Sequence, residues 1–327
     1  MLPRTLIAFA GALTIALPAA VAQAEPTKLR FGHVGEPGSL FAVSAENFAA
    51  CANPKLGDKA TVEVFGSSQL GNDQEMLQKL KLGQVDMALP SSVMSSVSPE
   101  FGVFEMPYIV QNREHMAKVR DEVVMKTLQD AVKKKGYEII GVWENGFRQI
   151  TNNTRPINKP EDLKGIKLRT PKGEWRVKMF QLYGANPTPM AFSEVFTALK
   201  TGVIDGQENP FAQIYSAKFQ EVQKYLSLTG HVYTPAYVLT AADKFAALDA
   251  DVQKVLSDCA QETSGWVYAK AAELDEDLLG KVKEAGVEVN EADKQAFIDA
   301  SKPIYDEFAK GVEGGPALIE AVQKLAQ

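Results

Sequence analysis

Segments typical of strands and of helices alternate through the first part of this chain. Residues 28–34, 60–65 and 84–89 have the apolar patterns of short strands, and helical patterns at 41–52 and around Met76 separate them. The order strand, helix, strand is typical of parallel sheets whose strands are joined by crossover helices. The chain is therefore expected to fold as an α/β protein.

Polar residues follow these predicted strands. Glu36 comes after the first strand, Ser68 after the second, and Ser91 and Ser92 after the third. In open α/β sheets, ligands bind beyond the carboxyl ends of the strands. We therefore expect Glu36, Ser91 and Ser92 to contribute to a ligand site.

Two arginines lie at the ends of further predicted strands. Arg169 ends the alternating segment 166–170, and Arg148 follows the strand pattern at 137–143. A guanidinium group offers a rigid fork of donors that matches a carboxylate. Arg169 alone is better explained as a structural ion pair or an exposed arginine, but two such arginines favour an anion site. Trp175, in the helical pattern after Arg169, suits either the core or a wall of the cleft.

The length of the chain and its first residues predict an exported protein with two lobes. A chain of 327 residues exceeds the size at which one core usually stops growing. Residues 1–24 combine Arg4, an apolar run at 6–17 and a small-residue end, as a cleaved secretory signal does. The run is too short for a membrane anchor. We therefore expect a soluble periplasmic protein that begins at Glu25.

Charge and motifs narrow the function. The formal net charge of −6 disfavours nucleic acid as a partner. Nucleotide-binding glycine loops and the G-x-S-x-G elbow of hydrolases are absent from the sequence. No cofactor and no enzymatic activity are therefore expected.

The cysteines and histidines give no metal-ligand spacing. Cys51 and Cys259 are the only cysteines. In an oxidising compartment they can form a disulfide, and the sequence leaves this open against two buried thiols. The histidines are scattered through the chain, at His33, His115 and His231.

A long run of helix-forming residues occupies 250–285. At 1.5 Å per residue such a helix extends on the order of 50 Å, which is enough to pass from one lobe to the other. We expect it to brace the two lobes.

Four motifs in order along the chain resemble those of the solute-binding subunits of tripartite ATP-independent periplasmic (TRAP) transporters, the DctP type. The motifs are FGSSQLG at 65–71, LRTP at 168–171, GANPTPM at 184–190 and DGQENP at 205–210. The resemblance implies the two-lobed α/β fold of periplasmic binding proteins, with a ligand cleft between the lobes. It places residues 25–145 and about 235–274 in lobe I, and residues 146–234 and about 275–327 in lobe II.

The same resemblance implies residue roles. Arg169 matches the arginine that binds the ligand carboxylate, Arg148 and Asn209 match its polar partners, and Phe192 matches the aromatic that packs on the ligand. Trp175 is a further candidate for the apolar wall. Val34 and Ser91 stand where a sialic-acid binder of the family has an asparagine and an acidic residue, which argues against a sialic-acid ligand.

The predicted function is the capture of a small organic carboxylate and its delivery to TRAP permease subunits driven by an ion gradient. A monomer without nucleic acid is expected. A binding protein of an ABC-type importer, a periplasmic enzyme acting on a carboxylate and a sensor for a membrane receptor are the alternatives. A hydroxy, keto or aromatic acid suits the predicted cleft, and a sulfonate stays open. The sequence identifies neither the acid nor the coupling ion.

Overall fold

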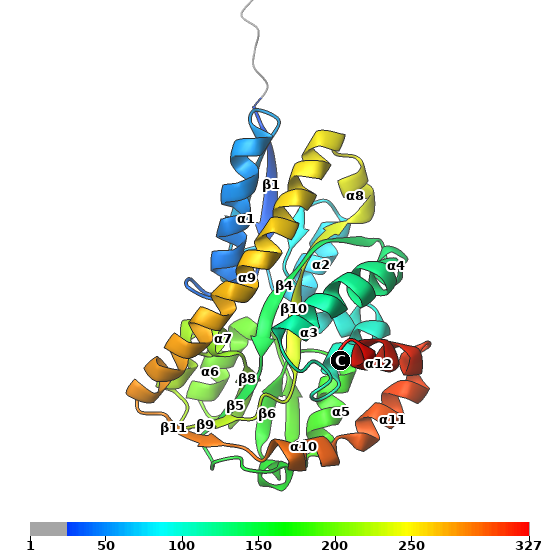
Figure 1. The fold of residues 1–327 in the computed structure, drawn as a ribbon. Coiled ribbons are helices and arrows are strands. Elements are labelled where there is room, and N and C mark those ends of the chain that lie inside the picture. Colours follow the sequence, from blue (N-terminus) through cyan, green and yellow to red (C-terminus); the bar gives the residue numbers. More distant parts are fainter. Residues whose placement is uncertain (1–24, 327) are drawn as a thin grey trace, which may run out of the picture.

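The structure is a computed structural model, and it describes residues 25–326. The predicted signal peptide, residues 1–24, lies outside the described residues. Two mixed β-sheets form the fold (Figure 1), and their strand orders are β2-β1-β3-β10-β4 and β11-β9-β5-β8-β6-β7. The strands of the first sheet are β1 (Thr27–Gly32), β2 (Ala60–Phe65), β3 (Met87–Ala88), β4 (Tyr137–Phe147) and β10 (Tyr233–Ala241). Those of the second are β5 (Gln149–Asn152), β6 (Lys167–Thr170), β7 (Asn186–Pro189), β8 (Gly206–Asn209), β9 (Tyr225–Leu228) and β11 (Glu288–Glu291).

Helices cover both sheets. In Figure 1 the first sheet, α1 and α8 occupy the upper half, and the second sheet with α5, α6 and α7 occupies the lower half. The α-helices are α1 (Leu40–Leu56), α2 (Asp73–Lys81), α3 (Arg113–Val119), α4 (Gln129–Lys133), α5 (Glu174–Leu182), α6 (Val195–Lys200), α7 (Phe211–Ser216), α8 (Ala242–Ala246), α9 (Ala250–Glu284), α10 (Lys294–Ala300), α11 (Lys302–Gly311) and α12 (Gly315–Lys324). Short 3₁₀ turns include η1 (Ser92–Ser96), η2 (Pro99–Glu105) and η5 (Phe192–Glu194), and a π-helical stretch, η3 (Arg120–Leu128), joins α3 to α4.

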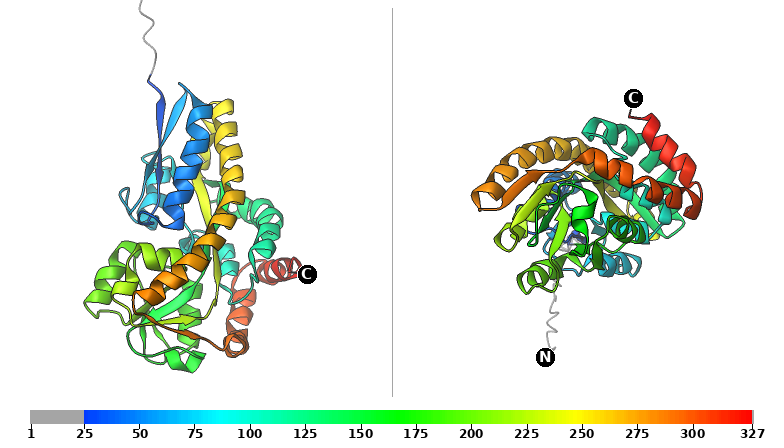
Figure 2. Two further views of the ribbon diagram at one scale, coloured as in Figure 1. Left: turned by 60° about the vertical axis from the view of Figure 1, so that its left-hand side comes forward. Right: turned by 90° about the horizontal axis from the view of Figure 1, so that it is seen from below.

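Helix α9 braces the two halves, as the sequence predicts. It has 35 residues, so it extends about 50 Å. It lies against β4 and α1 of the upper half and against α7 of the lower half (Figures 1 and 2). Trp143 of β4 donates a hydrogen bond from Nε1 to the carbonyl oxygen of Ala260 in α9. Neither α9 nor any other helix within residues 25–326 has the length and apolar character that spanning a membrane requires.

The chain passes between the sheets three times, once through α9 between β10 and β11 and twice at adjacent places. A single residue, Arg148, separates β4 of the first sheet from β5 of the second. Its backbone N–H donates to the carbonyl oxygen of Val232, which lies on the return path from β9 to β10. The fold therefore puts the side chain of Arg148 at the junction of the two halves.

Two strands near the junction of the sheets have unusual sequences. Strand β8 is the polar segment Gly206–Asn209, whose four residues are all buried. A run of polar residues does not indicate a buried strand. These side chains can be buried because ion pairs and hydrogen bonds satisfy them. Strand β10 begins at Tyr233 and includes Pro235. A register shift between Thr234 and Pro235 accommodates that proline, which cannot donate to a regular ladder.

The predicted lobe boundaries stay a prediction. The strands of the first sheet fall within 27–147 and 233–241, and those of the second fall within 149–228 and 288–291. The C-terminal helix α12, which the prediction places in lobe II, packs against η2 and η3.

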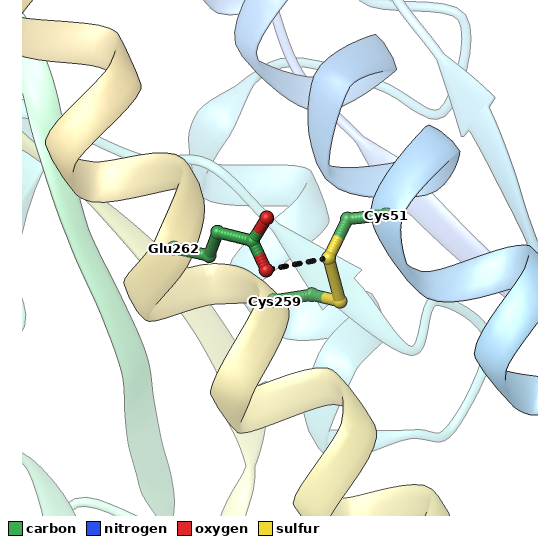
Figure 3. A group of neighbouring side chains, drawn as sticks. All are labelled: Cys51, Cys259 and Glu262. Atoms are coloured by element: carbon green, nitrogen blue, oxygen red, sulfur yellow. Dashed lines mark hydrogen bonds between the residues drawn. A yellow bond between two sulfur atoms is a disulfide. The ribbon is translucent and has the colours of Figure 1, made fainter.

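A disulfide joins Cys51 of α1 to Cys259 of α9 (Figure 3), which decides a question that the sequence left open. The two Cα atoms are 5.8 Å apart, a normal separation for a disulfide. Glu262 Oε2 lies 3.4 Å from Cys51 Sγ and forms a salt bridge of 3.1 Å with Lys55. Because the sulfurs are bonded to each other, they do not offer the thiolates that a metal ion would need. The disulfide holds the upper half of α9 against α1.

Reduction of this disulfide is expected to lower the free energy of unfolding by about 2–4 kcal/mol. The bond closes a loop across 208 residues, so it restricts the unfolded chain strongly. Urea unfolding with and without a reducing agent measures the loss. The Cys51→Ser, Cys259→Ser double variant serves as the control, because its stability must not respond to the reducing agent. Equal stability of the oxidised and reduced wild type contradicts the prediction.

Candidate ligand-binding site

A cavity lies between the two halves of the molecule. Counted together with the open solvent at its mouth, this space has a volume of about 370 Å³. Its walls come from both halves. The upper half contributes Val34, Phe41, Asp73, Ser91, Ser92, Val93 and Asn145. The lower half contributes Arg169, Pro171, Phe192, Asn209 and Gln213, and Arg148 lines the cavity from the junction between the halves.

Arg169 brings an unpaired positive charge into this cavity. The residue lies in β6 between β7 and β8, and it is only 4% exposed. Its Nε and Nη2 donate to the carbonyl oxygen of Met190, at 3.1 and 2.8 Å. Within residues 25–326 no carboxylate forms a salt bridge with Arg169. Burial, with the nearby charge of Arg148, lowers the pKa of Arg169 to about 9. An anion that enters the cavity would therefore stabilise the charged form of this guanidinium.

Arg148 differs from Arg169, because its charge is compensated within the protein. Its Nε donates to Glu208 Oε2 at 2.5 Å, and its Nη2 donates to Glu208 Oε1 and to Asn209 Oδ1, both at 2.9 Å. Glu208 also accepts a hydrogen bond of 2.7 Å from Arg176, which in turn donates to Glu105 at 2.6 Å. Each of these charged side chains is buried.

The buried ion pairs set the charge of Glu208. Although burial opposes ionisation, the charges of Arg148 and Arg176 hold the pKa of Glu208 well below its usual range. Burial lowers the pKa of His231, which favours its neutral form. The neutral ring donates from Nε2 to Glu208 at 3.1 Å and accepts at Nδ1 from Thr229. Since Glu105 belongs to η2 and Glu208 to β8, Arg176 links the two halves behind the cavity.

Six of the eight predicted site residues line the cavity. Arg169, Asn209 and Phe192 line it from the lower half, Ser91 and Ser92 line it from the upper half, and Arg148 lines it from the junction. Phe192 is held by an edge contact with Phe219, with ring centroids 5.7 Å apart. Their roles in ligand binding stay predictions.

The other two predicted site residues lie outside the cavity. Trp175 is buried against Phe308 of α11, with ring centroids 5.2 Å apart, so of the two places that the sequence allowed it takes the core. Glu36 accepts a hydrogen bond of 2.7 Å from Ser67 and is half-buried. Neither side chain is among those that line the cavity. We leave both out of the proposed ligand shell.

Sequence reasoning missed three polar residues of the cavity, namely Asp73, Asn145 and Gln213. Asp73 begins α2 after the glycine-containing loop, and Asn145 lies three residues before the junction at Arg148, so both had a positional signal. Gln213 sits in the short helix α7, and no local pattern distinguishes it from a surface glutamine.

Asp73 is a carboxylic acid in an unfavourable place for its charge. Burial raises its pKa to about 6, and the positive charge of Arg169 opposes this shift only in part. Its Oδ1 is shielded from water and accepts no hydrogen bond from the described residues. A ligand group that donates a hydrogen bond would remove this cost.

Asp73→Asn is expected to raise the melting temperature of the ligand-free protein at pH 8 and to change it little at pH 5. A carboxyl group whose pKa is raised on folding destabilises the protein above that pKa, and the cost vanishes as pH falls below it. With a pKa of about 6, the ionised form dominates at pH 8 and the neutral form at pH 5. Thermal melts of both proteins at the two pH values check this.

The exposed Asp130, replaced by Asn, is the control for the loss of one carboxylate. It is expected to shift the melting temperature slightly and equally at both pH values. An Asp73→Asn effect of the same size at pH 5 and pH 8 contradicts the prediction.

Comparison with known proteins places this geometry in a family. The model of the DctP family, "Bacterial extracellular solute-binding protein, family 7", matches residues 31–311. The 2,3-diketo-L-gulonate-binding periplasmic protein YiaO of Escherichia coli K12 is 36% identical over 300 residues, which are 91% of this chain and 92% of that protein.

Solved structures agree in fold. The sugar acid binding protein DctPAm of Advenella mimigardefordensis, in complex with galactonate, has a TM-score of 0.88 at 33% identity, covering 92% of this chain and 99% of that one. A TRAP periplasmic solute binding protein of Polaromonas sp. JS666, bound to D-erythronate, has a TM-score of 0.87 at 34% identity, covering 91% and 98%. The predicted two-lobed α/β fold is thereby confirmed. The chain belongs to the DctP family of solute-binding proteins, the binding subunits of TRAP transporters.

Proposed function

We propose that this protein captures a small organic carboxylate in the cavity between its lobes and delivers it to an ion-gradient-driven TRAP permease. The observation that carries the proposal is the buried guanidinium of Arg169, which lines the cavity and has no salt bridge with a carboxylate of the described residues. A carboxylate in the cavity would supply the missing partner in a two-pronged contact. The named relatives, which bind 2,3-diketo-L-gulonate, galactonate and D-erythronate, support an acid as the ligand.

Ligand binding would be coupled to closure of the lobes. The cavity has walls from both halves, so a ligand that touches both stabilises the closed arrangement by its differential affinity for it. Arg169, Arg148, Asn209 and Phe192 form the lower wall in this proposal, and Ser91 and Ser92 belong to the upper one. In this proposal Arg169 is the main partner of the ligand. Arg148 and Asn209 act mainly by keeping the shape of the cavity, because they are hydrogen-bonded to each other.

The proposed setting is the periplasm, with residues 1–24 removed after export, and the proposed partners are the ligand and the permease subunits. We propose a monomer that binds no nucleic acid, in keeping with the acidic net charge of −6. TRAP relatives favour this role over that of an ABC importer subunit.

We also propose that the ligand leaves the protein unchanged. Covalent or acid–base catalysis requires a nucleophile beside a positioned base. Among the described residues that line the cavity there is no histidine, cysteine or lysine. Recovery of the bound acid after prolonged incubation, checked by mass spectrometry, tests this, and a converted product would support the enzyme alternative.

Calorimetric titration of the purified protein with a panel of organic acids tests the binding function. At least one carboxylate is expected to bind with micromolar or better affinity, which corresponds to about 8 kcal/mol. The matched primary amide of the same acid is the control and is expected not to bind, since it lacks the charge that Arg169 requires. Equal binding of acid and amide, or no binding of any acid, contradicts the proposal.

A further inference from the structure

We propose that the preferred ligand is a hydroxylated monocarboxylate, whose carboxylate binds Arg169 and whose hydroxyl groups donate hydrogen bonds to Gln213 and Asp73. This inference rests on the proposed function, because it assumes a carboxylate at Arg169. It sets such acids above dicarboxylates and above unsubstituted acids of the same length.

The cavity has two ends with different chemistry. Asp73 and Arg169 also line an adjoining hollow together with Lys172 at the surface, so they mark the end near the mouth. Ser91 and Ser92 also line a small internal space beside Glu105, so they mark the deep end. A ligand whose carboxylate binds Arg169 therefore extends its other end toward the deep end.

Backbone carbonyls fix the direction of the hydrogen bonds at the deep end. Ser91 Oγ donates to the carbonyl oxygen of Pro235 at 2.6 Å, and Thr234 Oγ1 donates to that of Gly146 at 3.3 Å. A carbonyl oxygen can only accept, so both hydroxyl protons are committed. Asn145 lies 3.2 Å from Ser91 Oγ and 3.1 Å from Thr234 Oγ1, and must therefore turn its Nδ2 toward both.

The orientation of Asn145 in turn fixes that of Gln213. With its Nδ2 used, Asn145 presents Oδ1 to Gln213, which must answer with Nε2 at 3.4 Å. Gln213 Oε1 is thereby left without a donor, although the residue is only 3% exposed and lines the cavity. A buried acceptor without a partner is costly, so the ligand is expected to supply the donor.

The remaining polar atoms of the cavity point to the same chemistry. Asp73 Oδ1 is a second shielded acceptor without a partner in the described residues. Ser92 Oγ has no hydrogen bond to them either, but as a hydroxyl it can donate as well as accept, so it fits a ligand hydroxyl without requiring one. Ligand hydroxyls donate to such acceptors, whereas methylene groups and carboxylates do not. The cavity therefore offers one anion site and two acceptors, on Asp73 and Gln213, that require a donor.

The charges of the cavity argue against a second carboxylate. Among the described residues that line it, only Arg148 and Arg169 are cationic, and Arg148 is already paired with Glu208. Lys172 lines the adjoining hollow instead, and its ammonium donates to Gln74. A second carboxylate at the deep end would face the free oxygen of Gln213 without a compensating charge.

Two chain-matched series test the inference by calorimetry. The four-carbon series is D-erythronate, butyrate and succinate, and the six-carbon series is galactonate, hexanoate and adipate. In at least one series the hydroxylated acid is expected to bind at least tenfold more tightly than both of its partners. A dicarboxylate or an unsubstituted acid that binds best, or equally well, overturns the inference and leaves the proposed carboxylate function standing. If none of the six acids binds, the inference is wrong, and the full panel of organic acids decides whether the proposed carboxylate function stands.

Variants locate the hydroxyl contacts. Gln213→Ala is expected to lower the affinity for the hydroxylated acid about fivefold to tenfold. Asp73→Ala is expected to lower it about tenfold to a hundredfold, because the acceptor on Asp73 is charged. The affinity for the unsubstituted acid, measured at higher concentration, is expected to change little in both variants. Asp73→Asn keeps an acceptor but removes the charge, so affinity for the dicarboxylate is expected to rise.

Gln220→Ala is the matched control. Gln220 Oε1 is also a shielded acceptor without a partner in the described residues, but this residue does not line the cavity. Its replacement is expected to leave every affinity unchanged. If Gln213→Ala and Asp73→Ala weaken hydroxylated and unsubstituted acids by the same factor, they act only on the shape of the cavity and the inference is wrong.

Discussion

Arg169→Ala is expected to weaken binding of the organic acid at least about a hundredfold while the protein stays folded. Two charged hydrogen bonds to a carboxylate contribute roughly 1.5–3 kcal/mol each, and the variant removes both. Arg169→Lys keeps the positive charge but loses the planar fork, so its affinity is expected to lie between that of the wild type and that of Arg169→Ala. Calorimetric titration of the three proteins with the same acid measures the loss.

The ligand-free Arg169→Ala protein is not expected to be less stable than the wild type. Burial lowers the pKa of Arg169 to about 9, so the charged form is disfavoured by folding. A base whose pKa is lowered on folding destabilises the protein below that pKa, and this cost fades as pH rises toward the ordinary value. The variant removes this cost at neutral pH, and we expect that gain to offset the packing that the variant loses. An unfolded variant would therefore point to a structural role.

Arg155→Ala is the matched control for this experiment. Like Arg169, Arg155 donates only to backbone carbonyls, those of Asp162 and Lys164, at 2.7 and 2.5 Å. It does not line the cavity. Its replacement is expected to leave the affinity unchanged, so a comparable loss of binding in both variants would assign the effect to the lobe as a whole.

The part of the site that sequence motifs carry was predictable. Arg169, Asn209 and Phe192 lie in motifs that resemble the family, and the structure brings them to one cavity with Arg148. Strand ends helped as well, since Ser91 and Ser92 follow β3 directly and reach the same space. Local patterns succeed here because a short strand fixes where its last residues lie.

The rest of the site depends on contacts between distant segments. Trp175 packs on Phe308, more than a hundred residues later, and no local pattern shows that contact. The free oxygen of Gln213 results from hydrogen bonds that run through Asn145 to Ser91 and Thr234. Single residue types do not reveal which of their atoms remain without a partner, so the hydroxyl preference became visible only in the structure.

Glu208 shows why a motif can be found while the function of its members stays hidden. The residue lies in DGQENP at 205–210, beside Asn209, and the sequence assigned it no role. In the structure it joins Arg148, Arg176 and His231 in one buried cluster. Its alternating position in β8 suggested nothing more than a polar residue near a strand.

Glu208→Ala is expected to lower the free energy of unfolding by about 3–5 kcal/mol, because it leaves buried arginine charges without compensation. Arg148 loses its carboxylate partner, and Arg176 keeps only Glu105. Since the pKa of Glu208 lies below its usual range, its stabilising charge is lost only as pH falls through that low value. The deficit is therefore expected to be the same at pH 5 and pH 8, whereas the stabilisation expected for Asp73→Asn depends on pH. Urea unfolding at both pH values measures it.

Glu221→Ala separates this effect from the loss of any ion pair. Glu221 pairs with Lys218 at 4.0 Å on the surface, where such pairs contribute about 0–1 kcal/mol. A Glu208→Ala deficit as small as that of Glu221→Ala would mean that the buried charges are solvated or rearranged in solution. If the large deficit is found, Glu208 also explains the charge of the cavity, because it neutralises Arg148 and leaves Arg169 as the one unpaired cation that faces the ligand among the described residues. In a Glu208→Gln protein that still folds, Arg148 becomes a second free cation, so affinity for succinate relative to butyrate is expected to rise.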